Sequence, residues 1–282
     1  MKKQQPTLFC AGFGDSAKAL ARLMADEGWK IVPTTRSEAT QVRLRDEGYD
    51  ALLFEEGLAE KVPENAVWLI STPPDDEGCP SYKLLQNAAQ HARSIFYLST
   101  TGVYGDLGGG WAFEWTPVNP QSVQGERRVL AENQWRGARA DTNLVRLPGI
   151  YGPGRSAFDR LEEGKARRII KDGQVFSRVH VDDIAACLKG AIDRQVSAEV
   201  LHACDDEAAP PQDVIEYAAR LMGIDVPPDI PFEEAGLSEM AKRFYSECKR
   251  VSNARTKSLT GWRPIFADYR AGLQAIWAGM NL

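Results

Sequence analysis

The sequence predicts an α/β protein, a doubly wound parallel sheet with a smaller C-terminal cap. Short apolar runs alternate with amphipathic stretches in the first half of the chain, which is typical of β-α-β units. The connections between them are short, which favours a doubly wound sheet. After Tyr151 the order becomes irregular and proline pairs interrupt short helices, which indicates a separate cap.

The expected elements can be placed by residue. Seven apolar runs are expected strands: Thr7–Ala11, Ile31–Thr35, Ala51–Phe54, Val67–Ser71, Ser94–Ser99, Asn143–Leu147 and Val200–Ala203. Helices are expected over Ser16–Glu27, Lys83–Ala92, a stretch opening at Asn119, Val181–Arg194, Gln212–Met222 and Tyr269–Ala278. Residues 1–150 would form the core, with 176–206 returning to it, and residues 151–175 and 207–282 would form the cap. A cleft between core and cap is the natural binding site.

Composition excludes several classes of function. A hydrophobic content of 43% and a charged content of 26% are those of an ordinary globular protein. The formal net charge of −5 argues against a nucleic-acid partner, because phosphate binding needs a basic face. No run reaches the roughly 18 apolar residues of a membrane span, and the apolar run within 1–14 is too short for a signal peptide. The five cysteines have no metal-ligand spacing, so we expect a reduced, cytoplasmic protein without zinc.

The stretch FCAGFGDSAKAL carries the first chemical pattern. Gly12, Phe13, Gly14 and Ala17 form a G-x-G-x-x-A turn between an expected strand and an expected helix. Gly12 permits the tight turn, Gly14 lets the backbone approach a pyrophosphate, and the small Ala17 allows close packing. Phosphate charge is then favoured at the helix N-terminus. The pattern predicts a dinucleotide site on a Rossmann core, against the alternative of a purely structural turn.

The end of the second expected strand indicates which dinucleotide binds. It reads PTTRS, so the usual acidic ligand of the ribose is absent and Arg36 lies there instead. A guanidinium suits a 2′-phosphate, which favours NADP over NAD, although Arg36 could also be an ordinary exposed loop residue. Ser71 and Thr72 end the fourth strand and are expected to border the cofactor from the other side.

Four further stretches resemble one family over nearly the whole chain. YLSTTGVYGD, RLPGIYGPGR, SRVHVDDIAACL and SNARTKSLTGWRP occur in the order found in extended short-chain dehydrogenases/reductases, the NAD-dependent epimerase/dehydratase group. The resemblance implies a Rossmann core with a substrate cap that often takes nucleotide sugars, and a homodimer. It also places Thr100 at the family's catalytic Ser/Thr. The acidic pair of sugar dehydratases is replaced by Thr101 and Gly102, so sugar dehydration is not expected.

One departure bears on the chemistry. The family's Tyr-x-x-x-Lys pair, which moves the proton that accompanies hydride transfer, falls in this register on Gln124 and Arg128. An amide has no useful acidity, and a guanidinium keeps its proton at working pH. Arg128 could still bind ribose hydroxyls or a phosphate. The closest resemblance is therefore to an atypical, extended-like subgroup without this pair.

Other residues could replace the missing acid. Tyr104, Tyr151 and His180 lie in motifs expected near the carboxyl edge of the sheet, and each also has a structural alternative as a packed ring or a helix cap. Thr100 alone cannot serve, since its hydroxyl needs an adjacent base. Asp182 and Asp183 are expected to cap a helix rather than bind metal.

Between these motifs, GGGWAFEWTP holds Trp111, Glu114 and Trp115 and predicts either a mobile loop over the cleft or the covering of a core edge. Two hypotheses follow for the whole chain. One is an NAD(P)-dependent oxidoreductase or epimerase-like enzyme acting on a sugar-like or other small polar substrate, and the other is a catalytically silent NAD(P)-binding sensor or scaffold. The cofactor ligands expected in both cases are Gly12, Phe13, Gly14, Arg36, Ser71, Thr72 and Arg128.

Overall fold

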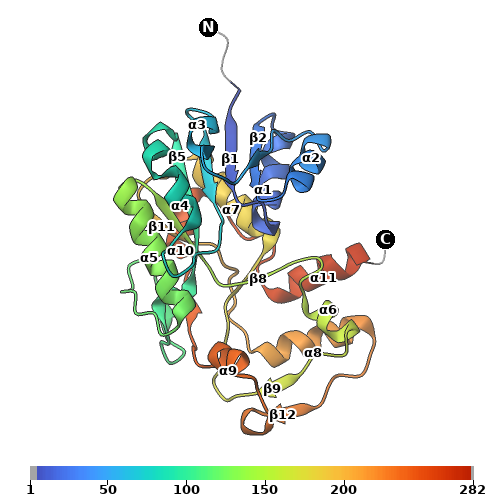
Figure 1. Ribbon diagram of the computed structural model, residues 1–282. Coiled ribbons are helices and arrows are strands. Elements are labelled where there is room, and N and C mark those ends of the chain that lie inside the picture. Colours follow the sequence, from blue (N-terminus) through green and yellow to red (C-terminus); the bar gives the residue numbers. More distant parts are fainter. Residues whose placement is uncertain (1–4, 281–282) are drawn as a thin grey trace.

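A seven-stranded parallel sheet forms the centre of the molecule (Figure 1). The computed structural model describes residues 5–280, without the side chains of Met240 and Arg243. The strand order is β11-β7-β5-β4-β1-β2-β3, so the chain winds outward in both directions from β1 and β4, as the sequence predicts. The strands are β1 (Thr7–Ala11), β2 (Lys30–Thr35), β3 (Leu52–Leu53), β4 (Val67–Ile70), β5 (Ser94–Thr100), β7 (Asn143–Leu147) and β11 (Val200–His202).

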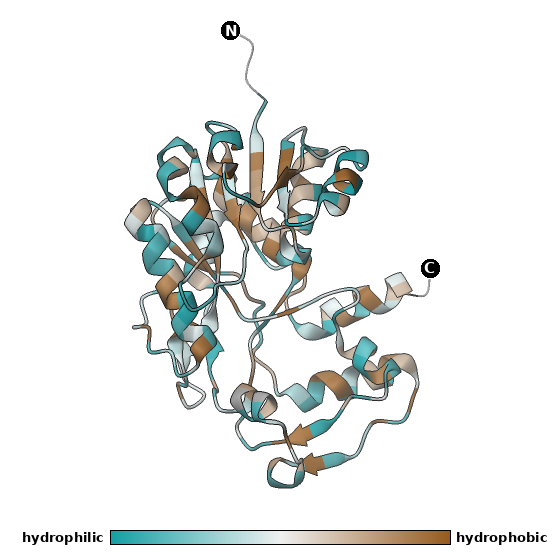
Figure 2. Ribbon diagram, viewed as in Figure 1, coloured by the Kyte–Doolittle hydropathy of each residue, from teal (hydrophilic) through white to brown (hydrophobic). Residues whose placement is uncertain are grey.

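Helices cover both faces of this sheet because alternate strand residues point to opposite sides. Leu8 and Cys10 of β1 pack into one core with α1 (Asp15–Asp26) and α7 (Val181–Asp193). Phe9 and Ala11 pack into the other core, with α3 (Leu58–Lys61), α4 (Pro80–Leu85), the 3-10 helix η1 (Gln86–His91) and α5 (Val123–Ala138). The strands are the most apolar part of the structure (Figure 2). Helices α2 (Glu38–Asp46) and α10 (Ala254–Thr260) complete the layers.

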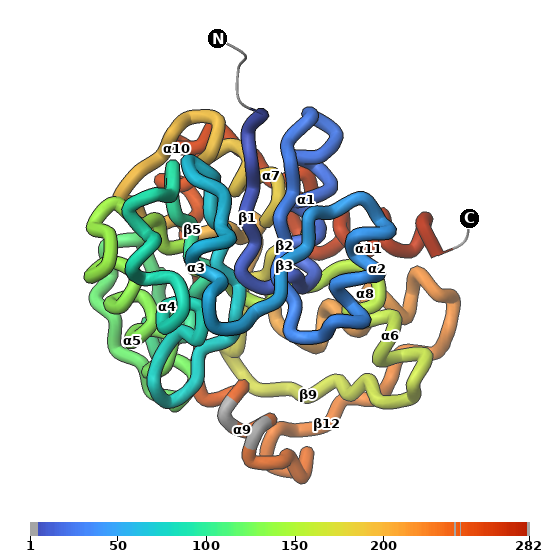
Figure 3. The backbone as a smooth tube through the Cα atoms, turned by 45° about the horizontal axis from the view of Figure 1, so that its top comes forward, coloured from blue at the N-terminus to red at the C-terminus, as the bar shows by residue number. Residues whose placement is uncertain are grey.

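A second group of elements lies below the sheet in Figure 1 and is called the cap region here. It contains α6 (Ala157–Glu162), β9 (Arg168–Ile170), α8 (Pro211–Met222), β12 (Asp229–Pro231), η3 (Phe232–Glu234), α9 (Glu239–Tyr245) and α11 (Tyr269–Met280). Strands β9 and β12 pair in parallel and run side by side in Figure 3. Phe158, Leu273 and Ile276 form the separate apolar core of this region.

Two short parallel pairs occupy the space between the sheet and the cap region. β8 (Gly149–Tyr151) pairs with β10 (Arg178–His180), and β6 (Trp111–Ala112) pairs with β13 (Arg250–Val251). The 3-10 turn η2 (Thr101–Tyr104) follows β5 directly. The predicted division of the chain into core and cap segments stays a prediction, and residues 1–4 and 281–282 of those segments lie outside the described part.

Two expected helices differ in extent from the prediction. The helix expected at Lys83–Ala92 begins earlier, since Pro80 starts α4, and its second half tightens into η1. The helix expected from Asn119 begins at Val123, because the Ser122 hydroxyl accepts the N–H of Gly125 and caps it. Pro120 therefore precedes the helix and is not part of its first turn. Within residues 5–280, no helix has the length and apolar character needed to cross a membrane.

Candidate functional site

The turn after β1 needs glycine at position 12. Gly12 has a φ of +92°, a conformation that residues with a Cβ rarely adopt. A Cβ there would lie 2.8 Å from the Ser71 Oγ and 3.2 Å from the Thr72 N, both at the end of the neighbouring β4. The Gly12 N–H donates to the Thr34 hydroxyl at 2.9 Å, and this hydroxyl donates to the Cys10 carbonyl at 3.1 Å. The turn is thus held tightly between β2 and β4.

Gly14 differs from Gly12, because the space beside it is open. It is the N-cap of α1 with an ordinary φ of −82°, and no side chain caps the helix. A Cβ at Gly14 would meet no atom within 4 Å. The first-turn N–H groups of α1 therefore face an open space without a side-chain acceptor, which is the arrangement that an anion needs at a helix N-terminus.

A pocket of about 150 Å³ adjoins this helix end. Three residues expected to bind cofactor meet in it, namely Gly14, Ser71 and Arg128, although they come from different parts of the chain. The other lining residues are Asp15, Ser16, Ala17, Leu98, Ser99, Leu147 and Ile150. Ser99 and Asp15 were not singled out from the sequence, and the signals that could have found them are a polar residue at the end of a buried strand and an acid inside a glycine turn.

Arg128 reaches into this pocket from α5. Its Nη1 donates to the Leu98 carbonyl at 2.5 Å and to the Tyr97 hydroxyl at 3.3 Å, so the guanidinium is fixed against the end of β5. Gln124 lies one turn earlier on the same helix and is exposed. Of the two residues that replace the family's Tyr-x-x-x-Lys pair, Arg128 lines the pocket and Gln124 is not among its lining residues.

The remaining expected ligands have different surroundings. Arg36 is exposed directly after β2, where a 2′-phosphate would be expected. The Phe13 ring is half-buried and packs edge-on against Tyr49, with centroids 5.3 Å apart. The Thr72 hydroxyl bonds the Ser81 hydroxyl at 2.7 Å and is thus directed toward α4. The Thr100 hydroxyl accepts the N–H of Gly102 at 3.1 Å and caps η2.

Tyr104 belongs to a sealed polar network under the sheet. Glu132 of α5 and Arg146 of β7 are about 95% buried and form a two-bond ion pair, with N–O distances of 3.0 and 2.7 Å. Ser99 donates to Glu132 at 2.5 Å, and the Arg146 Nη1 donates to the Tyr104 hydroxyl at 2.8 Å. Tyr104 also contacts the His202 Nε2 at 2.6 Å. Glu132, Arg146 and His202 are not predicted from the sequence. The pattern that could have revealed them is an isolated polar residue within an apolar segment.

The direction of the Tyr104 proton follows from these contacts. Burial lowers the pKa of His202 to about 4, so its ring is neutral at pH 7. Its Nδ1 lies 2.9 Å from the Ser252 carbonyl, which can only accept, so Nδ1 carries the proton and Nε2 accepts. Tyr104 must then donate to His202, and burial raises the pKa of Tyr104 to about 12. These partners favour the structural alternative for Tyr104, and a catalytic role remains a prediction.

The other two candidate acids lie near the cap region. The His180 Nδ1 accepts the N–H of Asp182 at 3.2 Å and caps α7, and burial lowers the pKa of His180. The rings of Tyr151 and His180 meet edge-on with centroids 5.2 Å apart. The Tyr151 hydroxyl is buried against Gly272 of α11 without a hydrogen-bond partner among the described residues.

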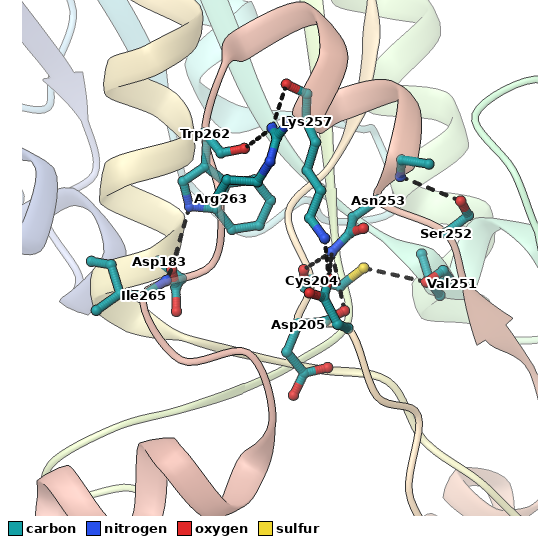
Figure 4. A network of polar contacts seen from close by, with 12 residues as sticks. Asp183, Cys204, Asp205, Val251, Ser252, Asn253, Lys257, Trp262, Arg263 and Ile265 are labelled. Atoms are coloured by element: carbon teal, nitrogen blue, oxygen red, sulfur yellow. Dashed lines mark hydrogen bonds and ion pairs between the residues drawn. The ribbon is translucent and has the colours of Figure 1, made fainter.

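The two adjacent acids at the start of α7 have separate environments. Asp183 is buried and accepts from the Trp262 indole, the Ile265 N–H and the Phe266 N–H, so it fixes the segment after α10 (Figure 4). Asp182 is exposed. Among the residues that the structure describes, no cluster of three His, Cys, Asp or Glu side chains could hold a metal ion.

The loop with two tryptophans is open at its surface and anchored beneath. Trp111 and Trp115 are 53% and 70% exposed. Glu114 between them is buried and accepts from the N–H and the hydroxyl of Thr256 on α10. The Glu114 Oε1 therefore attaches the loop to the core, whereas its Oε2 is buried without a hydrogen-bond partner among the described residues.

Comparison with known proteins identifies the architecture. No family model and no curated protein matches the chain. A conserved protein of unknown function from Silicibacter pomeroyi DSS is 43% identical, with 99% of this chain and 100% of that chain covered and a TM-score of 0.90. A Methylobacillus flagellatus protein described provisionally as an NAD-dependent epimerase/dehydratase is 24% identical, with 99% of each chain covered and a TM-score of 0.72.

A third solved structure is similar in fold alone. The human epimerase family protein SDR39U1, solved with NADPH, is 16% identical, with 97% of this chain and 99% of that chain covered and a TM-score of 0.75. The chain therefore belongs to the same family as the conserved Silicibacter pomeroyi protein, and its fold is that of an atypical, extended-like short-chain dehydrogenase/reductase of the NAD-dependent epimerase/dehydratase group.

Proposed function

We propose that the protein binds NADP(H) at the glycine turn and acts as an oxidoreductase or epimerase-like enzyme with a non-standard active site. The open end of α1 is the observation that supports this most strongly. Gly12 is required by the turn itself, whereas Gly14 is required by nothing in the protein, since a side chain there would enter empty space. A glycine kept beside an open helix N-terminus fits a pyrophosphate that approaches the backbone closely.

Different residues around the pocket would bind different parts of the cofactor. The N–H groups of α1 would bind the pyrophosphate, and Arg36 would bind the 2′-phosphate. Ser71, at the end of β4, would contact the ribose. Arg128 would lie beside the nicotinamide ribose, in the place of the family's lysine. A bound nicotinamide would supply the hydride acceptor or donor, and the substrate would enter from the side of the cap region.

Gly14→Ser tests the position of the dinucleotide. Serine is a preferred N-cap, and its hydroxyl would accept the N–H groups that we assign to the pyrophosphate. We expect thermal stability to stay equal or rise, while the affinity for NADPH, measured by fluorescence titration, falls at least about tenfold. Gly137→Ser on the exposed face of α5 is the matched control, because a Cβ there also meets no atom within 4 Å. Unchanged NADPH affinity in Gly14→Ser would place the dinucleotide elsewhere.

A second candidate function is a catalytically silent NAD(P)-binding sensor or scaffold. It is supported by the exposed Gln124 and by Tyr104, whose proton is committed to His202. Turnover of NADPH over a panel of carbonyl substrates separates the two candidates, with the double variant Gln124→Tyr, Arg128→Lys as the reference. Turnover in the variant alone would favour the silent protein, and turnover in the wild type would favour the enzyme.

The proposal also covers the cellular compartment, the oligomeric state and the binding partners. We infer a cytoplasmic homodimer with a small polar, sugar-like substrate and no nucleic-acid or membrane partner. The net charge of −5 supports the absence of nucleic acid, and the likeness in fold to epimerases supports the substrate class. Sedimentation of the purified chain at several concentrations tests the dimer.

A further inference from the structure

We propose that Arg178 and Asp205 form a binding site for a small hydroxylated oxyanion, a carboxylate or phosphate with a hydroxyl on a neighbouring carbon. The site lies where β10 and the segment after β11 meet the cap region. The proposal rests on the proposed function, because this site would bind the substrate of that reaction.

Arg178 is a half-buried residue with two donors that no described residue uses. Its Nη1 donates to the carbonyls of Phe176 and Ala209 at 2.8 and 3.1 Å, which fixes the plane of the guanidinium. Its Nε and Nη2 have no partner among the contacts of the described residues. These two N–H groups are parallel, and one carboxylate or phosphate can accept both at once.

Asp205 is the complementary group. It is 5% exposed, and neither of its carboxyl oxygens has a hydrogen bond of good geometry in the described structure, although the backbone N–H groups of Arg178 and Glu207 lie close enough to lower its pKa. Figure 4 shows this carboxyl group turned away from the nearby contacts of Asn253 and Lys257. A buried carboxyl group without a partner is costly, and such groups in native proteins usually have a role that offsets the cost.

The two residues are neighbours that do not pair. The Asp205 N–H donates to the Arg178 carbonyl at 2.8 Å, so their backbones are in contact. Their side chains nevertheless form none of the ion pairs found within 4 Å in the described part of the chain, although Arg178 is the strongest charge acting on Asp205. A ligand that accepts from Arg178 and donates to Asp205 would satisfy both.

The surroundings favour an anion that also carries hydroxyl groups. Burial raises the pKa of Asp205 to about 8, so at neutral pH this carboxyl is mostly uncharged and leaves the charge of Arg178 available. The Tyr151 hydroxyl, also buried without a hydrogen-bond partner among the described residues, interacts electrostatically with Asp205 and Arg178. The Tyr269 ring lies beside the guanidinium, with 5.9 Å from the Arg178 Cζ to the ring centroid, and gives one wall of the site.

Access requires a local opening. Both Asp205 oxygens are closed to solvent, and the segment that follows is held to the chain before β10 by paired backbone hydrogen bonds of Phe176 and Ala209, at 3.1 Å each. We therefore expect a ligand to reach Asp205 only when these two hydrogen bonds separate.

Calorimetric titration of the full chain with four probes tests the site. Glucuronate and glucose 6-phosphate carry an oxyanion and hydroxyl groups, glucose lacks the anion, and hexanoate lacks the hydroxyl groups. We expect glucuronate, glucose 6-phosphate or both to bind at least about tenfold more tightly than glucose and hexanoate. The stronger of the first two tells whether the oxyanion is a carboxylate or a phosphate.

Variants assign the binding to the two residues. Arg178→Lys keeps the charge and a donor for the carbonyls but loses the parallel pair, so we expect the affinity for the bound probe to fall about tenfold. Asp205→Leu removes the acceptor for a ligand hydroxyl and should reduce the preference over hexanoate. Arg255→Lys, at an exposed ion pair with Glu199, is the matched control and should leave both unchanged.

Two results would overturn the site: no probe binding at about 10 mM, or equal affinities in wild type and Arg178→Lys. NADPH titration of the same samples separates the two proposals. If NADPH binds and no oxyanion does, only the oxyanion site fails. If NADPH does not bind, the proposed function fails whatever the probes do.

Discussion

Two groups of polar residues in this molecule differ in whether the protein satisfies them. In the network of Ser99, Glu132, Arg146, Tyr104 and His202, each side chain bonds another, although Ser99 also lines the pocket beside α1. At the open end of α1 no side chain caps the helix, and the carboxyl oxygens of Asp205 have no hydrogen bond of good geometry in the described structure.

This difference separates fold from function. Satisfied groups stabilise the protein and have little capacity left for a ligand, whereas unsatisfied buried groups cost stability and keep that capacity. Tyr104 is one of the three candidate acids by sequence, but it belongs to the first group. We therefore expect changes in the sealed network to affect stability, and changes at the open groups to affect binding.

Glu132→Ala should have the largest effect. It leaves the Arg146 guanidinium buried without its carboxylate, and we expect the free energy of unfolding to fall by about 3 to 5 kcal/mol in urea titration. Glu126→Ala, on the exposed side of the same helix, is the control. A loss below about 1 kcal/mol would show that the network is not a main source of stability.

Asp205→Asn should change how stability depends on pH. Burial raises the pKa of Asp205 from an ordinary value of 3.8 to about 8 in the folded protein, so the folded state binds more protons and stability falls as pH rises from 4 to 8. Arg178 and Asp206 are the charged groups that act on it. About four pKa units correspond to a fall of up to about 6 kcal/mol, and we expect the variant to lack most of it because asparagine does not titrate. Parallel pH profiles of wild type and variant would contradict the assignment.

Arg36→Asp should act on binding alone. An acid there repels a 2′-phosphate and can accept from a 2′-hydroxyl, so the ratio of NADPH to NADH affinity should fall at least about tenfold. Because Arg36 is exposed, thermal stability should barely change. Arg43→Asp on the outer face of α2 is the control. An unchanged ratio would remove the preference for NADP.

Asp15→Asn should have the smallest effect, an increase. Its carboxylate lines the pocket in the first turn of α1, where it complements the helix dipole but repels a pyrophosphate. We expect NADPH affinity to rise about threefold while stability falls by about 0.5 kcal/mol. Asp26→Asn at the other end of α1 should leave the affinity unchanged. Weaker NADPH binding in Asp15→Asn would mean that the carboxylate contacts the ligand favourably.

The sequence predicted the strands of the sheet well because each strand follows from a local pattern. Apolar runs such as Val67–Ile70, buried on both faces, and the glycine turn at Gly12 carry their own structural signal. It predicted the open pocket in part, since Gly14, Ser71 and Arg128 converge there. The pairing of Glu132 with Arg146 depends on α5 crossing β7, and the lack of a partner for Asp205 depends on how the cap region packs. Neither is visible in local sequence.

The most direct test of the central claim is fluorescence titration of the wild-type chain with NADPH. The open, uncapped end of α1 predicts saturable binding of one dinucleotide per chain, with a dissociation constant below about 100 μM and weaker binding of NADH. Absence of saturable binding by both dinucleotides at about 1 mM would contradict the claim that this helix end is a cofactor site.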